Sequence, residues 1–241
     1  MHWLLVSQVI VVTVWWLAGW IPGLVVMLLS HAFFVVPVFL PNSGFYAPVV
    51  SRWAAAADRV WLTIDDGPSE DTPALLALLA RHGAKATFFV VGERAAARPD
   101  LVRAIVQAGH SLGNHSHSHP QARFWALGPA ALRRQVDHCQ QVLASITGQA
   151  PRWYRSVVGH TNPFVAPALA ANNLVRVGWS ARGFDGVECA PERVLSRLLP
   201  QLQPGAVVLL HEGGPAGQAE AVLAGVLDAL QVRGLRADIP G

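Results

Sequence analysis

The first 51 residues contain no Asp, Glu, Lys or Arg, although the chain of 241 residues has 18 Lys and Arg and 15 Asp and Glu. Residues 3–40 of this uncharged part form a long apolar stretch. Neither a soluble domain nor a disordered chain has this distribution, because disorder needs low hydrophobicity and high net charge. The sequence therefore predicts a membrane-embedded N-terminus followed by one globular domain of about 190 residues, long enough for a single core.

The apolar stretch is too long for one membrane-spanning helix, which needs about 20 residues, and fits two short ones. Pro22-Gly23 interrupts it. We expect helices at 4–20 and 23–40, which makes residues 1–41 a multi-pass membrane anchor and 42–58 a linker. A retained anchor is favoured over a cleaved signal peptide, because no basic residue precedes the apolar run. One long helix followed by a surface segment is the alternative.

The charge and the cysteines exclude little else. Formal net charge is +3, and the 17 Arg and single Lys are scattered rather than clustered. No run of basic residues marks a nucleic-acid surface, so we expect no nucleic-acid partner. Cys139 and Cys189 permit one intrachain disulfide at most and are interpreted as half-buried thiols.

From residue 59 to 241 short apolar runs alternate with helical patterns. Such alternation predicts an α/β fold with parallel strand pairing, and six or seven units favour a barrel over an open sheet. Strands are expected at 60–64, 87–91, 110–113, 153–154, 174–179 and 206–210. Helices are expected at 72–81, 99–108, 130–146, 163–171, 191–199 and 216–232. Chemistry in such barrels lies at the C-terminal ends of the strands.

Asp65 and Asp66 stand at the first such strand end, in Thr63-Ile64-Asp65-Asp66-Gly67. Asp-Gly is also a common hairpin dipeptide, but a helical pattern follows here instead of a strand. Adjacent carboxylates repel one another unless a cation or a shared proton relieves the repulsion. The pair is therefore a candidate for metal or proton chemistry.

A cluster of histidines follows the 110–113 strand. His115 and His119 are four residues apart, a spacing that one metal ion can bridge, and neutral imidazole suits zinc. A solvated His-rich loop is the alternative. His117 should point away from the other two, and His110 is expected to be structural.

A third candidate, His211, ends the apolar run Val207-Val208-Leu209-Leu210. A histidine at that strand end can be catalytic or merely ordinary. One carboxylate and two histidines would make a three-ligand metal site with positions open for water and substrate. A second carboxylate and another histidine could then serve as base and acid.

Five motifs in order resemble the polysaccharide deacetylase (NodB homology) family, carbohydrate esterase family 4. Thr63–Gly67 resembles its TFDDG motif, and His115–His119 matches its H-S/T-x-x-H motif in full. Leu209–His211 matches its apolar-x-Leu-His motif. Arg155–Gly159 keeps only part of R-P-P-Y-G, and Trp179–Gly186 keeps an Asp but has Gly where Trp is usual. The resemblance covers nearly all of the part that follows the anchor.

This resemblance implies a distorted (β/α) barrel with one divalent metal, usually zinc. It implies that Asp66, His115 and His119 hold the metal. Asp65 would be the general base and His211 the general acid.

The resemblance also assigns supporting roles. Arg155 is expected to hold Asp65, Asp185 to tune the acid–base groups, and the Val158 N–H to bind the oxyanion. Since Ser156–Val158 replaces the family's Pro-Pro-Tyr, the substrate groove should differ from that of a chitin deacetylase.

The expected activity is metal-dependent removal of an N-acetyl group from an amino sugar. The partner would be an N-acetylated cell-envelope glycan or a lipid-linked amino sugar at a bacterial inner membrane. The sequence does not determine on which side of that membrane the catalytic domain lies. A membrane-anchored glycan-binding pseudoenzyme is the alternative.

Overall fold

The computed structural model describes residues 2–54 and 57–240. Its strands are β1 (Arg59–Gly67), β2 (Thr87–Val90), β3 (Ser111–Asn114), β4 (Trp153–Tyr154), β5 (Val175–Arg176), β6 (Ala181–Arg182), β7 (Val207–His211) and β8 (Arg236–Asp238). Its α-helices are α1 (His2–Ala18), α2 (Trp20–Val35), α3 (Thr72–Arg81), α4 (Gly92–Ala97), α5 (Pro99–Gln107), α6 (Pro129–Thr147), α7 (Val165–Ala170), α8 (Pro191–Leu198) and α9 (Gln218–Val232). Short 3-10 turns are η1 (Val36–Phe39), η2 (Phe124–Ala126), η3 (Val157–Gly159) and η4 (Leu199–Gln201).

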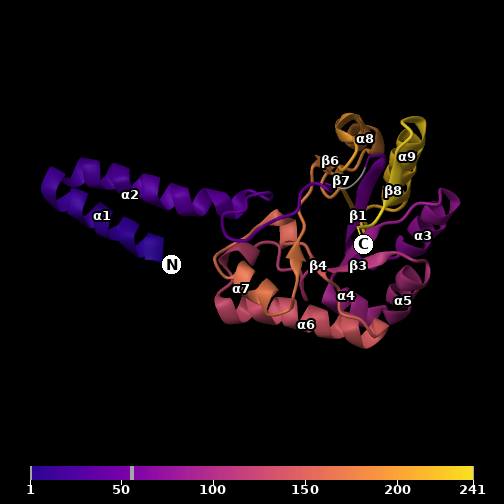
Figure 1. Cartoon of the computed structure of the whole chain (residues 1–241), viewed down its shortest axis with the longest axis horizontal. Helices are drawn as coiled ribbons and strands as arrows, with labels where there is room; N and C mark the ends of the chain where they lie inside the picture. Colours follow the sequence, from indigo (N-terminus) through magenta and orange to yellow (C-terminus); the bar gives the residue numbers. More distant parts are fainter. Residues whose placement is uncertain (1, 55–56, 241) are drawn as a thin grey trace.

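The predicted alternation of strands and helices with parallel pairing is confirmed. The main path of the sheet runs β5-β4-β3-β2-β1-β7-β6, with β8 paired to the start of β1, and every named pair is parallel. Helices cover the outside of this curved sheet (Figure 1). The elements α4, β6 and β8 were not predicted from the sequence. The expected strand 174–179 also merged β5 with the following extended segment, because five of its six residues are apolar or small.

The curved sheet is a partial barrel. The strands at its two edges, β5 and β6, are consecutive in the sequence. β5 pairs with β4 at one end, and β6, five residues later, pairs with β7 at the other. Residues 177–180 cross between them. Val50 bridges to Val177, and Arg52 bridges to Ala206 just before β7.

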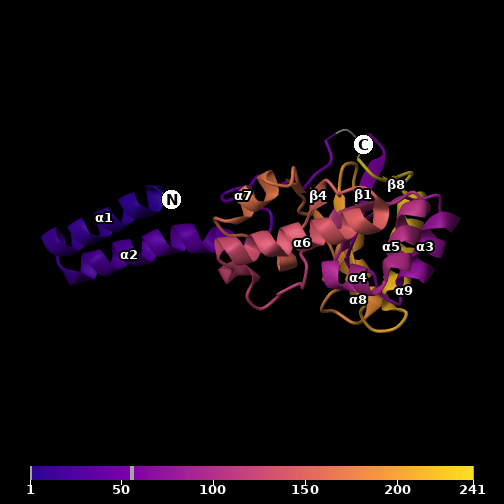
Figure 2. The ribbon, with the colours of Figure 1, turned by 90° about the horizontal axis from the view of Figure 1, so that it is seen from below.

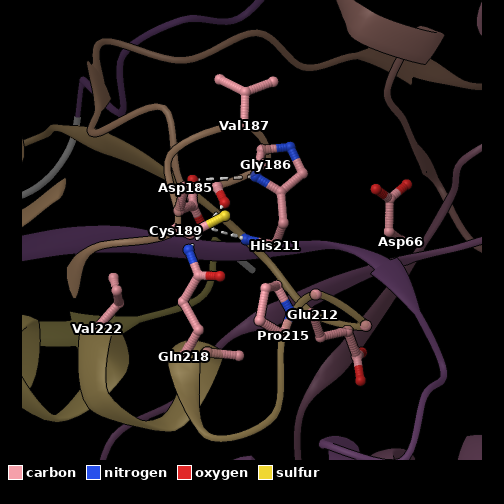
Figure 3. A pocket seen from close by; sticks show the side chains of 13 residues that line it. Asp66, Asp185, Gly186, Val187, Cys189, His211, Glu212, Pro215, Gln218 and Val222 are labelled. Atoms are coloured by element: carbon pink, nitrogen blue, oxygen red, sulfur yellow. Dashed lines mark hydrogen bonds and ion pairs between the residues drawn. The ribbon is translucent and has the colours of Figure 1, made fainter.

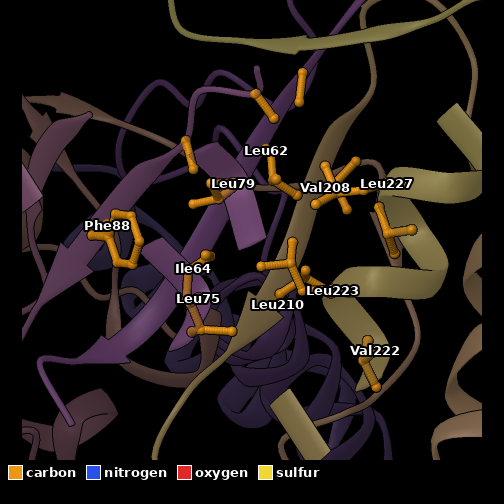
Figure 4. Close-up of a cluster of buried hydrophobic side chains, with 14 of the residues drawn as sticks. Leu62, Ile64, Leu75, Leu79, Phe88, Val208, Leu210, Val222, Leu223 and Leu227 are labelled. Atoms are coloured by element: carbon orange, nitrogen blue, oxygen red, sulfur yellow. The ribbon is translucent and has the colours of Figure 1, made fainter. Parts of the chain in front are cut away.

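Alternation within β1 and β7 sorts their residues between two faces. Leu62 and Ile64 of β1 pack outward with Val208 and Leu210 of β7 against α3 and α9 (Figure 4). The intervening residues face inward, where Trp61 packs with Leu209 and other barrel-lining side chains.

The same parity positions two polar side chains at the mouth of the barrel. Asp65 follows Trp61 on the inward face of β1, and His211 follows Leu209 on the inward face of β7. These two residues are register partners in adjacent strands. The hydrophobic pattern of two buried strands thereby sets Asp65 and His211 together.

At the N-terminus α1 and α2 lie side by side as a helical hairpin that projects from one end of the molecule (Figures 1 and 2). The expected break between the helices at Pro22-Gly23 is wrong. The break is at Gly19, whose φ of 94° favours glycine, and Pro22 lies in the first turn of α2. Gly23 instead allows close packing, since a Cβ there would lie 2.7 Å from Trp15 Cγ.

Of the described helices, Trp20–Phe39 is long and apolar enough to cross a membrane. The apolar part of α1, Trp3–Ala18, is shorter. The structure thus supports one candidate span, and the expectation of two crossings is not supported.

The segment after α2, of which residues 42–50 were expected to be linker, packs closely on the domain. Asn42 Nδ2 donates to the Trp179 carbonyl at 2.7 Å, and Trp179 N–H donates to Asn42 Oδ1 at 3.2 Å. The buried Arg176 guanidinium donates to the carbonyls of Pro41, Ser43 and Ala47 at 2.7 to 3.2 Å. The base of the hairpin is therefore part of the barrel wall.

Asn42→Ala should lower the free energy of unfolding by about 1–3 kcal/mol, because it removes two hydrogen bonds and leaves the Trp179 main chain unpaired. Chemical denaturation of the full chain in detergent, followed by tryptophan fluorescence, measures the change. The exposed Gln149→Ala is the control and should stay within about 0.5 kcal/mol of the parent. Equal stability of both variants would show that the segment does not stabilise the domain.

Candidate active site

The two carboxylates at the end of β1 lie in different environments. Asp65 is buried, whereas the side chain of Asp66 is 24% exposed. Asp66 adopts φ 70°, and the pairing of β1 with β2 shifts register between Asp65 and Gly67. This irregularity lets two adjacent residues both serve one site, which a regular strand would direct to opposite faces.

Asp65 is held by Arg155. Arg155 Nη1 lies 2.7 Å from Asp65 Oδ1 and also donates to Thr63 Oγ1 at 2.7 Å. The remaining guanidinium nitrogens donate to the carbonyls of Val177 and Gly178. Arg155 is fully buried, so these acceptors replace the water that the cation has lost.

Asp66, His115 and His119 converge on one point. Asp66 Oδ1 lies 3.5 Å from His115 Nε2 and 3.1 Å from His119 Nε2. One ligand atom from each of the three lies within 4.8 Å of the others. This is the arrangement that three protein ligands of one metal ion require.

The loop that carries the two histidines is held by the side-chain amides of Asn114 and Gln135. Asn114 Oδ1 accepts from the Ser116 N–H, and Gln135 Oε1 accepts from the N–H groups of His117 and Ser118. Ser116 and His119 both have positive φ, at 66° and 49°. Backbone strain of this kind persists where surrounding contacts fix it.

The donor set suits a divalent cation. Asp66 Oδ1 is buried without a hydrogen-bond partner in the described residues. His115 Nδ1 lies 2.9 Å from the Arg155 carbonyl, which places its proton there and leaves Nε2 toward the carboxylates. An unpaired buried carboxylate oxygen facing two imidazole nitrogens is relieved by positive charge at their centre.

The pKa values of these three residues also favour a cation site. Burial, with the charges of His115 and Arg94, lowers the pKa of His119 to about 4, so this imidazole is neutral at pH 7. Burial opposes ionisation of Asp66, but the adjacent His115, followed by His119 and His211, lowers its pKa overall. Burial would lower the pKa of His115, yet Asp65 and Asp66 raise it. The positive charge that the carboxylates favour at His115 Nε2 can come from a proton or from a metal ion.

His117 and His110, which were not expected to bind the metal, lie outside this group of ligands. The His117 ring packs edge-on to His138, with centroids 5.4 Å apart, and approaches Gly92 of α4. His110 lies near Phe88 and accepts from the Ala86 N–H at 3.3 Å. Burial, together with Lys85, lowers the pKa of His110 to about 4.

His211 forms two hydrogen bonds with Asp185. Asp185 Oδ1 lies 3.0 Å from His211 Nδ1, and Asp185 Oδ2 accepts from the His211 N–H at 2.6 Å (Figure 3). Burial would lower the pKa of His211, but Asp185, aided by Asp65 and Asp66, raises it to about 9. His211 therefore carries a proton at neutral pH and can donate it.

A cleft of about 160 Å³ joins these groups. Asp65, Asp66, His115, His119 and His211 line one part of it. The other walls include Ser156, Val158, Trp179, Arg182, Phe184 and Asp185. Val158 has φ 48°, an outlier for a β-branched residue, at the position where the sequence departs from Pro-Pro-Tyr.

Sequence reasoning missed two charged residues beside the site. Glu212 is buried and accepts from Ser69 Oγ at 2.7 Å and Thr72 Oγ1 at 2.5 Å, and burial raises its pKa. Arg94 of α4 donates to the Asp66 carbonyl. Glu212 could have been suspected because it follows His211 directly, whereas α4 was not recognised as an element.

The thiols are free. Cys139 is buried and Cys189 is exposed, so neither is half-buried as expected. The immediate sequence does not distinguish them, because a charged or polar residue precedes each: His138 before Cys139 and Glu188 before Cys189.

Comparison with known proteins decides the family. A family model described as polysaccharide deacetylase matches residues 54–177. The chain belongs to the polysaccharide deacetylase family. The resemblance predicted from the five motifs is thereby confirmed.

Individual relatives agree with this assignment. The chain is 37% identical over 161 residues to a chitooligosaccharide deacetylase of Bradyrhizobium, covering 66% of this chain and 73% of that one. It is 32% identical over 181 residues to a peptidoglycan-N-acetylglucosamine deacetylase of Bacillus cereus, covering 74% and 65%.

The solved structure of a family 4 carbohydrate esterase from Streptomyces lividans superposes with a TM-score of 0.70. It shares 33% identity and covers 78% of this chain and 95% of that one. The predicted distorted barrel of NodB type is confirmed.

Proposed function

We propose that this protein is a metal-dependent hydrolase that removes an N-acetyl group from an amino sugar of a cell-envelope glycan or a lipid-linked sugar. The observation that carries the proposal is the convergence of Asp66, His115 and His119 beside a buried carboxylate and a protonated histidine. The relatives named for chitooligosaccharide and peptidoglycan deacetylation support the amino-sugar substrate.

Asp66, His115 and His119 would hold the divalent cation, and their nitrogen and oxygen donors favour zinc. A cation bound there supplies Lewis acidity for the acetyl carbonyl and lowers the pKa of water. Asp65 then accepts the proton of the attacking water. Its Oδ1 is occupied by Arg155, while Oδ2 lies 3.7 Å from His115 Nε2 and faces the site.

His211 is positioned as the acid. Amide hydrolysis breaks the C–N bond, and the amine leaves only after its nitrogen gains a proton. His211 Nδ1 is bound to Asp185, so Nε2 is the atom that delivers this proton. Asp185 orients the ring and stabilises its charged form.

The departures from the family motifs bear on the substrate. Val158 would direct its main-chain N–H at the developing oxyanion, a role that a change of side chain does not remove. Its side chain is 37% exposed in the cleft and apolar where the family has Tyr. This favours a substrate that differs from a plain chitin chain.

A glycan-binding pseudoenzyme is the second candidate, and the altered third and fourth motifs favour it. The complete set of ligands, base and acid counts against it, since loss of any one would stop turnover. For location, α2 with η1 supports attachment to a membrane, which we propose to be the bacterial inner membrane.

Acetate release from N-acetylated sugars tests the proposal. Removal of metal by a chelator should abolish release, and added Zn²⁺ should restore it. His119→Ala should weaken Zn²⁺ binding by more than the ~10–100-fold typical of outer-sphere changes. The matched His117→Ala should bind Zn²⁺ as the parent does, because its ring faces His138. Zinc-independent release, or equal loss of zinc in both variants, would contradict the site.

Asp185→Asn should move the basic limb of the kcat/KM–pH profile to lower pH by about one unit. His211 acts as an acid only while protonated, so activity falls as pH rises through its pKa. The Asp185 charge raises that pKa, and its removal lowers it. Asp228→Asn, exposed on α9, is the control and should leave the limb in place. An unshifted limb in Asp185→Asn would mean that another group controls it.

A further inference from the structure

Arg182 lies in the cleft with no function in the chemistry described so far. It belongs to β6, and its guanidinium carbon sits 3.7 Å from the centroid of the Phe184 ring and 5.4 Å from that of Trp179. The cleft that it lines is the one that contains Asp65, Asp66 and both metal-site histidines.

Within the described residues, the guanidinium contacts aromatic rings but forms no ion pair with a carboxylate. Its Nε is buried without a hydrogen-bond partner, and the hydrogen bonds found among residues 2–54 and 57–240 include none from this side chain. The main chain of Arg182 is fixed separately, because Gln201 pairs with both its N–H and its carbonyl. The side chain is half-buried, so its cationic end has donors that remain available to a ligand in the cleft.

Aromatic stacking fixes where the cation is presented. Phe184 has φ 66° and is 44% exposed, so its ring stands at the rim of the cleft over Arg182. A planar guanidinium held on a ring face keeps its forked N–H groups available for a phosphate or a carboxylate. Burial lowers the pKa of Arg182 while Asp185 opposes that shift, so an added anion would also stabilise its charge.

The cleft wall continues into the membrane segment, which favours one of these anions. Gly159 is sandwiched between Pro41, which follows α2 and η1, and Trp179, since a Cβ there would lie 2.6 Å from one and 2.7 Å from the other. Asn42 binds the main chain of that same Trp179. The site is therefore tied within a few residues to the candidate span. A phosphate that joins a sugar to a membrane lipid would lie at this interface.

We propose that Arg182 binds the phosphate that joins an amino sugar to a membrane lipid, and so selects a lipid-linked sugar as substrate. The exposed apolar side chains on the rim, Val158, Phe184 and Val187, would contact the first part of the lipid. This inference rests on the proposed deacetylase function and makes its substrate class specific.

Three N-acetylglucosamine probes test the inference with the full chain in detergent micelles. One is the farnesyl phosphodiester, and the second is the farnesyl glycoside, which has the same lipid and sugar without phosphate. The third is a disaccharide with N-acetylmuramic acid, which offers a carboxylate instead. Acetate release gives kcat and KM for each probe with the parent, Arg182→Gln, Arg182→Lys and the remote exposed Arg103→Gln.

The parent should prefer the phosphodiester over the glycoside by about tenfold or more in kcat/KM, the effect of one charge-assisted hydrogen bond. Arg182→Gln should reduce that ratio about tenfold, mainly through KM for the phosphodiester. Arg182→Lys should retain part of the preference as a point charge. Arg103→Gln should keep the ratio of the parent.

Each other result has a separate meaning. Acetate release without preference for phosphate, or equal losses of Arg182→Gln on both lipid probes, would overturn the inference and leave the deacetylase proposal standing. An Arg182-dependent preference for the muramic acid probe would replace the lipid with a carboxylate-bearing glycan. No acetate from any zinc-loaded sample would contradict the deacetylase function itself.

Discussion

The buried ion pair between Arg155 and Asp65 is the interaction on which the site depends. A fully buried guanidinium is tolerated only when its donors are satisfied, and here two acceptors lie in β1 and two lie in residues 177–178. The pair joins β1 to the residue that follows β4 and to the segment that crosses from β5 to β6. The Arg155 carbonyl in turn orients His115. Removal of Arg155 would leave Asp65 buried without a counter-charge, a loss that typically costs about 3–5 kcal/mol.

This pairing separates the tasks of two adjacent carboxylates. Asp65 has one oxygen neutralised by Arg155, whereas Asp66 has an oxygen that is buried and unpaired between two imidazoles. Asp65 already has a positive charge beside it, whereas Asp66 Oδ1 has none bound to it in the described part of the chain. The electrostatics therefore favour a cation at Asp66 and leave Asp65 available to take a proton. Across the cleft, Asp185 raises the pKa of His211, so the proposed acid holds the proton that a leaving amine would need.

Much of this could be predicted because it follows from local periodicity. Asp65 and His211 each end a buried apolar run, which places both at the C-terminal ends of parallel strands. The i, i+4 spacing brings His115 and His119 together. Contacts between distant segments could not be predicted. The packing of Asn42 on Trp179, the burial of Glu212 by Ser69 and Thr72, and the unpaired Arg182 depend on which strands become neighbours. The helix break lies at Gly19 and not at the predicted Pro22-Gly23, because proline is accepted in a first helical turn.

The most direct test of the central claim compares the two neutralised carboxylates by calorimetric titration of metal-free protein with Zn²⁺. Asp65→Asn should bind one ion with nearly the affinity of the parent, although its acetate release should fall about 10²–10⁴-fold. Asp66→Asn should lose most of its affinity for Zn²⁺. A loss of Zn²⁺ affinity in Asp65→Asn as large as that in Asp66→Asn would show that Asp65 is a metal ligand and would contradict the division of roles between the two.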